Sequence, residues 1–190
     1  MKKLLSIFLC LILLLSLISC TGDEEPAKKT VVLPFESLKL SFCSGAGAWS
    51  TELILNADGS FTGFYMDNSV ADSDSEDYPD GTNYVCDFIG SFENIRKINE
   101  YTYALSLGEV STSKEYGEEW IEDRVRYIAS PPYGIYDGRE FFLYAPEAPV
   151  GELDKTFLSW FPIGLEFDGE KLGKYGLFNV ETGDGFFSFE

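Results

Sequence analysis

Five Asp-Gly pairs recur along the chain, and they separate short runs of apolar or aromatic residues. The pairs are Asp58-Gly59, Asp80-Gly81, Asp137-Gly138, Asp168-Gly169 and Asp184-Gly185. Asp-Gly favours the positive backbone angles of tight hairpin turns, so it is a strong short-range signal for two antiparallel strands. Turns at this spacing leave room for short strands rather than long helices, and the chain is therefore predicted to be all-β.

The runs between these turns show the period-two alternation of half-buried strands. Apolar and polar residues alternate in 38–42, 49–55, 61–66, 84–92 and 101–107. The run Phe141-Phe142-Leu143-Tyr144 contains no polar residue, which predicts a strand that is buried on both faces. The segment 118–129 fits a helix as well as a strand, and we favour the strand.

One segment departs from this pattern. Leu153, Phe157, Trp160 and Phe161 recur at helical spacing, and Pro149 and Pro162 bound them. This predicts one short amphipathic helix near residues 151–160, packed against the rest as a plug. Residues 31–190 are expected to form a single antiparallel β domain, either a meandering barrel or a sandwich, because their number suits one hydrophobic core.

The N-terminal segment has the organisation of an export signal. Lys2 and Lys3 precede an apolar run from Leu4 to Ile18 that is short for a membrane span. The residues Leu17-Ile18-Ser19-Cys20 that end this run resemble the lipobox of bacterial lipoprotein precursors. An ordinary secretory signal or an uncleaved anchor are the alternatives.

This resemblance implies a signal peptide at 1–19 that is cleaved between Ser19 and Cys20. It further implies that Cys20 carries the lipid, including acyl chains such as palmitate, and holds the chain at the cell membrane or outer membrane on the extracytoplasmic side. Residues 20–30 are polar and without apolar period, so we expect a lipidated terminus followed by a flexible tether. The membrane is then a partner through the anchor alone.

A second resemblance concerns the domain. Gly47-Ala48-Trp49 at the start of a strand and the Asp58-Gly59-Ser60-Phe61 hairpin are loosely similar to the lipocalin-like barrels of bacterial lipoproteins. Those lipoproteins are uncharacterised, so the resemblance brings no activity with it. It implies an up-and-down barrel with an apolar interior, and a fold by itself does not define a function.

Composition excludes several classes of function. The chain is 45% hydrophobic and 16% aromatic, which is too apolar for a disordered protein. Its formal net charge of -18 should repel nucleic acid and anionic lipid surfaces. It has no histidine, so Ser-His and Cys-His catalysis and histidine-based zinc sites are excluded. We therefore expect a protein that binds a partner and is not an enzyme.

Cys43 and Cys86 are the two thiols that remain after the signal and the lipidated cysteine are set aside. Outside the cytoplasm such a pair predicts a disulfide. Strict alternation opposes this, because it puts Cys43 on the polar face of its strand and Cys86 on the apolar face. A bulge near Gly45 would remove the conflict, and two buried free thiols are the alternative.

Acidic residues form two clusters. Asp72, Asp74, Glu76 and Asp80 lie in one expected loop and are candidate calcium ligands, although Asp77 and Asn83 break the EF-hand pattern. A solvated acidic loop without metal is the favoured interpretation, and no other cofactor is expected. The second cluster surrounds Trp120 and suggests a small carboxylate-dependent, glycosidase-like hydrolase as an alternative function.

The three tryptophans are candidate ligand-binding residues. Trp49, Trp120 and Trp160 could line an open end of the barrel, although aromatic residues are more often part of a core. The expected function is a membrane-anchored module that binds a small molecule, a carbohydrate or an envelope protein. A structural partner in envelope assembly is a further alternative.

Overall fold

The computed structural model describes residues 31–45, 47–69, 75–165 and 169–189. The predicted signal peptide, its cleavage site and the lipid-bearing Cys20 lie outside these residues. The strands are β1 (Ser37–Cys43), β2 (Trp49–Asn56), β3 (Ser60–Ser69), β4 (Thr82–Lys97), β5 (Thr102–Thr112), β6 (Glu119–Glu122), β7 (Val125–Ala129), β8 (Glu140–Tyr144), β9 (Gly176–Asn179) and β10 (Gly185–Phe187). A 3₁₀ turn (Val150–Glu152) precedes the helix α2 (Lys155–Ser159).

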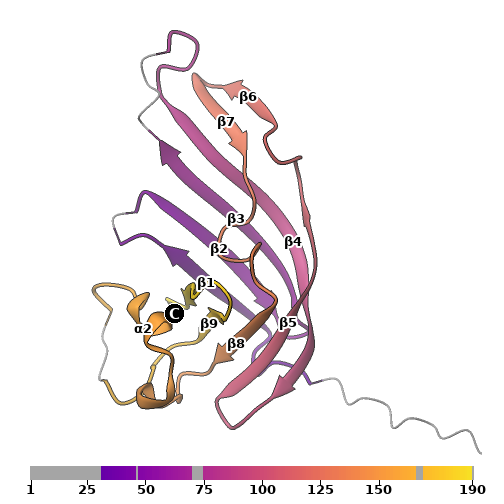
Figure 1. The fold of residues 1–190 in the computed structure, drawn as a ribbon, viewed down its shortest axis with the longest axis vertical. Coiled ribbons are helices and arrows are strands. Elements are labelled where there is room, and N and C mark those ends of the chain that lie inside the picture. Colours follow the sequence, from indigo (N-terminus) through magenta and orange to yellow (C-terminus); the bar gives the residue numbers. More distant parts are fainter. Residues whose placement is uncertain (1–30, 46, 70–74, 166–168, 190) are drawn as a thin grey trace, which may run out of the picture. The chain divides into compact units, whose positions relative to one another are not determined.

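Eight of these strands close into an antiparallel barrel (Figure 1). Each of the strands β1 to β4 pairs with the strand that follows it. β5 then pairs with β8, and β8, β9 and β10 continue the ring back to β1. The order is therefore a meander interrupted once, by β6 and β7. The prediction of an all-β, up-and-down barrel is confirmed, and the sandwich alternative is wrong. An eight-stranded barrel has an interior just wide enough to be filled by side chains.

The β2–β3 hairpin forms where Asp58-Gly59 predicted it. Gly59 has φ of 90°, and the Asp58 carboxylate accepts a hydrogen bond from the Ser60 amide at 2.9 Å. The strands then continue in register, with Leu55 opposite Phe61. A side chain at residue 59 would meet the Phe92 carbonyl oxygen at 2.6 Å, so glycine is required for packing as well as for the turn.

β6 and β7 form an arm that is attached to β4 rather than included in the barrel (Figure 1). The first residues of β4, Thr82 to Val85, pair with β7 in parallel, whereas Phe88 to Lys97 pair with β5. The strand prediction for 118–129 is confirmed, but the segment is a hairpin rather than one strand. Its turn is made by Asp123 and Arg124, with φ of 46° and 68°, a pair without glycine that the sequence does not mark as a hairpin turn.

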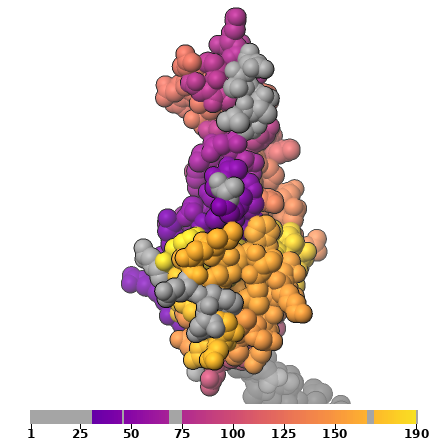
Figure 2. All heavy atoms as spheres, turned by 90° about the vertical axis from the view of Figure 1, so that its left-hand side faces the viewer, coloured from indigo at the N-terminus to yellow at the C-terminus, as the bar shows by residue number. Residues whose placement is uncertain are grey.

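The barrel wall from β8 to β10 separates two hydrophobic cores. Phe141 and Leu143 of β8 point into the barrel, whereas Phe142 and Tyr144 point outward, as predicted for a strand buried on both faces. Phe157, the buried residue of α2, packs on the outer side against Tyr144. The predicted short helix is therefore present and packs against the barrel: Phe157 covers the outer wall, whereas Trp160, which follows the helix, packs against the inner core. Figure 2 shows the helix-containing segment spread over the lower part of this face.

Candidate functional site

The interior of the barrel is filled by buried apolar side chains, many of them aromatic. Phe92 packs on Phe61 and on Phe141, with ring centroids 5.0 Å apart in both pairs. The connection between β7 and β8 closes one end, because Ile135 enters the core and is fully buried. Two hydrogen bonds hold this connection in place, from Thr51 Oγ1 to the Tyr133 carbonyl at 2.8 Å and from Asn179 Nδ2 to the Gly134 carbonyl at 3.0 Å.

Trp49 and Trp160 are brought together at the same end of the barrel. Both rings contact Phe42 at a centroid distance of 4.8 Å, and they lie 6.2 Å from each other. The indole nitrogen of Trp160 donates a hydrogen bond to the Gly183 carbonyl at 3.0 Å. These contacts link the outer helix segment to the barrel wall. The two tryptophans therefore pack like core residues rather than like the lining of an open pocket.

Tyrosines with altered acidity border this cluster. Burial, together with the nearby charge of Asp67, raises the pKa of Tyr65 to about 12. Burial also raises the pKa of Tyr133, whose ring contacts Trp49 at 5.1 Å. Both phenols stay neutral at physiological pH, so they act here as hydrogen-bonding and packing groups rather than as bases.

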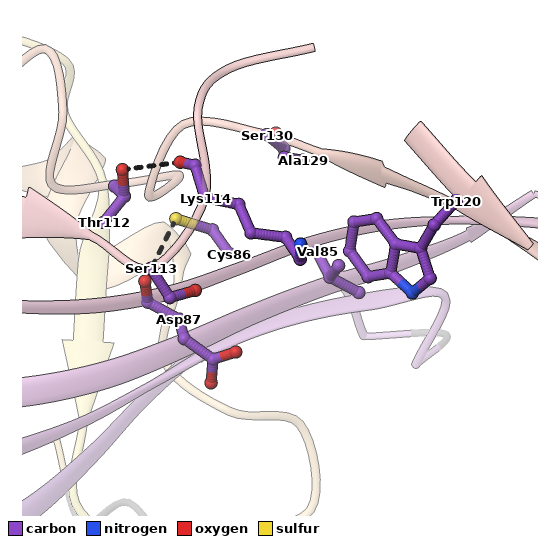
Figure 3. A pocket seen from close by; sticks show the side chains of 9 residues that line it. All are labelled: Val85, Cys86, Asp87, Thr112, Ser113, Lys114, Trp120, Ala129 and Ser130. Carbon is purple, nitrogen blue, oxygen red and sulfur yellow. Dashed lines mark hydrogen bonds between the residues drawn. The ribbon is translucent and has the colours of Figure 1, made fainter. Parts of the chain in front are cut away.

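Trp120 lies apart from the other two tryptophans, on the β6–β7 arm. Its ring stacks on Tyr127 at 5.2 Å and 11°, and the Lys114 ammonium lies 4.6 Å from its centroid. Figure 3 shows Lys114 reaching toward the indole across a notch of about 70 Å³ beside β4. Tyr127 and Lys114 thus contact this indole, which also lines an open surface hollow of about 530 Å³ together with Tyr78, Ile121 and Arg126.

Two of the carboxylates near Trp120 are paired with cations. Glu118 forms an ion pair with Lys114, and Glu119 pairs with Arg126 at 2.7 Å. The hydrogen bond from Lys114 lowers the pKa of Glu118 below its ordinary value. A general acid for glycoside hydrolysis needs the opposite shift. The Glu118 carboxyl is therefore poorly suited to act as the general acid of the hydrolase that the sequence left as an alternative.

The acidic loop that holds the candidate calcium ligands is described only in part. Asp72 and Asp74 lie outside the described residues, and Glu76 is exposed to solvent. Asp80 is engaged by Arg124 Nε at 2.9 Å, which lowers the pKa of this carboxyl. Within the described ranges no three acidic or thiol side chains come close enough together to hold a metal ion.

Cys43 and Cys86 are free thiols, so the predicted disulfide is wrong for this structure. Cys43 lies opposite Ser50, Ser50 opposite Met66, and Met66 opposite Val85. At about 4.8 Å per strand, three steps put the cysteine backbones roughly 14 Å apart along the sheet, and a disulfide needs less than about 7 Å. Cys86 also faces the core, as the alternation indicated, whereas Cys43 stays in register opposite Ser50 and is only partly buried.

A groove that the sequence did not indicate lies where the barrel closes. It has a volume of about 470 Å³ and runs between β1 and the chain that follows β10. Its apolar lining comes from Phe35, Leu38, Tyr175 and Phe189, which are far apart in sequence. Only the pairing of the first strand with the last brings them together, so no local pattern could have revealed this site.

The fold and its surfaces define a small closed β-barrel with a filled interior and an outer groove. Comparisons of the chain with protein-family models, with curated proteins and with solved structures found no match. In the described part of the chain, no helix has both the length and the apolar character needed to span a bilayer.

Proposed function

We propose that this chain is a lipid-anchored lipoprotein of the extracytoplasmic membrane face, and that its barrel binds a partner on the outer surface. The lipobox-like Leu17-Ile18-Ser19-Cys20 supports the anchor, and the polar residues after it supply a tether. Two or more acyl chains on Cys20 would be enough for stable attachment.

The filled interior is the main observation in favour of binding on the outer surface of the barrel. Small-molecule pockets usually measure about 300 Å³ or more, whereas the barrel interior is occupied by buried side chains such as Phe61, Phe92, Ile135 and Phe141. A ligand held inside the barrel is therefore disfavoured. Of the partner classes considered, an envelope protein that docks on the outside fits best.

Binding rather than catalysis is favoured by the chemistry of the side chains. The sequence has no histidine, and the Glu118 carboxyl near Trp120 is held in its ionised form by Lys114. The net charge of -18 favours a partner with a basic surface, because electrostatic attraction speeds association and selects among partners.

The anchor is tested by expressing the full chain in bacteria with radiolabelled palmitate and measuring the intact mass of the membrane-extracted protein. We expect label on the wild-type chain, a mature N-terminus at Cys20, and no label on a Cys20→Ser variant. An unacylated mature chain, or one that begins at another residue, would overturn the proposed anchor.

The proposal that partners bind on the outer surface, and not inside the barrel, is tested on the same extracted protein. Its thermal unfolding is measured with oleate as a fatty-acid probe. A ligand present at 100 times its Kd stabilises a protein by about 2.7 kcal/mol, a readily detected shift in midpoint. We expect oleate to leave the midpoint unchanged. If oleate raised the midpoint of the wild-type protein but not that of an Ile135→Phe variant, the interior would be shown to bind ligands.

A further inference from the structure

The closing contact of the barrel is unusually short. β1 pairs with β2 along its whole length, from Ser37 opposite Asn56 to Cys43 opposite Ser50. It pairs with β10 at one position, Ser41 opposite Phe187. After that position the last strand stays with β9, because the Ser188 amide donates to the Tyr175 carbonyl at 3.0 Å. A gap therefore opens between 37–39 of β1 and 188–189, and we call this gap the seam.

The alternation of backbone hydrogen bonds identifies the groups that face the seam. The Ser44 amide donates to Trp49 and the Ala57 amide to the Glu36 carbonyl, so even-numbered residues bond toward β2. Odd-numbered residues then direct their amide and carbonyl groups the other way, toward β10. For Ser37 and Lys39 those groups find no backbone partner among the described residues. They form a short open strand edge, with a spacing of about 7 Å between them.

The groove of about 470 Å³ lies along this edge and offers apolar walls beside it. Phe35 and Tyr175, which both line the groove, meet edge to face with ring centroids 5.3 Å apart. Phe189, which is half exposed, stands on the far side of the gap. Free backbone groups next to apolar walls are the two elements that bind an added β-strand: the backbone supplies hydrogen bonds and the walls select side chains.

Three carboxylates lie around the seam, those of Glu36, Glu52 and Glu147. The Lys39 ammonium is neutralised by Glu52 at 3.1 Å, and Glu36 is exposed just before β1. Burial and then the charge of Glu147 raise the pKa of Tyr175, which indicates a further carboxylate near the groove. With a chain net charge of -18, the seam favours a segment whose polar residues are basic.

We propose that the seam binds an extended segment of a partner protein, with alternating basic and apolar residues, as an added strand against Ser37 and Lys39 of β1. This inference rests on the proposed surface-binding function and names the place and the partner chemistry. The added strand would take up the open edge groups and fill the groove between β1 and Phe189. Its apolar side chains would pack on Phe35 and Tyr175.

The test uses the full-length protein extracted in detergent and three end-capped heptapeptides. The first alternates lysine and valine, the second alternates glutamate and valine, and the third is the lysine–valine peptide with methylated backbone nitrogens. Binding is measured by fluorescence anisotropy, and amide hydrogen exchange reports on Ser37 and Lys39. We expect the first peptide alone to bind and to slow exchange at both amides.

Two variants at one residue isolate the backbone group. Lys39→Pro removes the amide that faces the seam, and Lys39→Ala keeps it while losing the same ion pair with Glu52. We expect Lys39→Pro to weaken lysine–valine peptide binding about tenfold relative to Lys39→Ala, since leaving one peptide carbonyl unpaired costs on that scale. If Lys39→Pro does not fold, the methylated peptide on the wild-type chain tests the complementary hydrogen bonds, those that the peptide amides donate to the Ser37 and Lys39 carbonyls.

Three results would overturn the proposal. They are equal binding of the methylated peptide, equal affinity of the two Lys39 variants, and no protection of the Ser37 and Lys39 amides by the lysine–valine peptide. Palmitate labelling at Cys20 is measured separately. Loss of the seam proposal, with label still present on Cys20, is therefore distinguishable from failure of the proposed lipid anchor.

Discussion

Replacing Phe157 by alanine tests whether the helix segment is held on the barrel as described. Phe157 is fully buried, and its ring lies 5.1 Å from Tyr144, 5.5 Å from Phe178 and 4.7 Å from Phe187. Gly176 and Gly185 lie directly under the ring, and they have no side chains that could move into the space it leaves. The truncation should therefore create a cavity that the surroundings cannot refill.

The expected loss follows from this lack of relaxation. Phe→Ala changes in cores cost about 3–5 kcal/mol, and the upper half of that range applies where the site cannot collapse. For a unit the size of 31–190, about 4 kcal/mol corresponds to a midpoint lowered by roughly 10 °C. Urea unfolding followed by tryptophan fluorescence measures the free energy of unfolding, and circular dichroism measures the midpoint.

Tyr136→Ala is the matched control, because Tyr136 is an aromatic residue that is 64% exposed. Its loss should change the free energy of unfolding by no more than about 0.5 kcal/mol. A cost below about 1 kcal/mol for Phe157→Ala would refute the reasoning, since it would mean that α2 does not pack on β8 to β10.

Two further predictions concern the core. Gly63→Ala should lower the free energy of unfolding by about 1–3 kcal/mol, because an added methyl group would lie 2.1 Å from the Phe88 ring; adding Phe88→Leu should restore part of that loss in the same urea titration, and an unchanged cost would contradict it. The buried Cys86 thiol should resist alkylation at pH 9 while Cys43 reacts, because burial and then the charge of Asp87 raise the pKa of Cys86 to about 11. A raised thiol pKa favours the protonated folded state, so its contribution to stability is present below pH 9 and is lost as the pH rises toward 11. Thermal midpoints over that interval should fall less for Cys86→Val, and equal falls would count against the assignment.

The strands were predictable because their information is local. Alternation in 38–42 and 49–55 is imposed by one buried face, and Asp58-Gly59 fixes the turn between β2 and β3. The all-apolar run 141–144 likewise predicted a strand that is buried on both faces. Each of these signals lies within about ten residues of chain, so no knowledge of distant partners was needed.

The predictions that failed concern contacts between residues that are far apart in sequence. The Cys43–Cys86 disulfide failed because the registers of β1 to β4 keep the two backbones apart, and neither local sequence records that distance. The helix was correctly predicted, but its place on the outer wall depends on Phe178 and Phe187, which follow it in the chain. Trp120 was a candidate for stacking on a ligand, and its contacts with Tyr127 and Lys114 could not be predicted from the local sequence.

The pairing of the first barrel strand with the last has a consequence for how the chain folds. Ser41 can meet Phe187 only after residue 187 has been synthesised, so the ring cannot close before β10 has left the ribosome. Until then β1 to β5 can assemble only as an open curved sheet whose inner face is exposed to water. A chain shortened before β10 should therefore stay in that open, aggregation-prone state, whatever the stability of its individual hairpins.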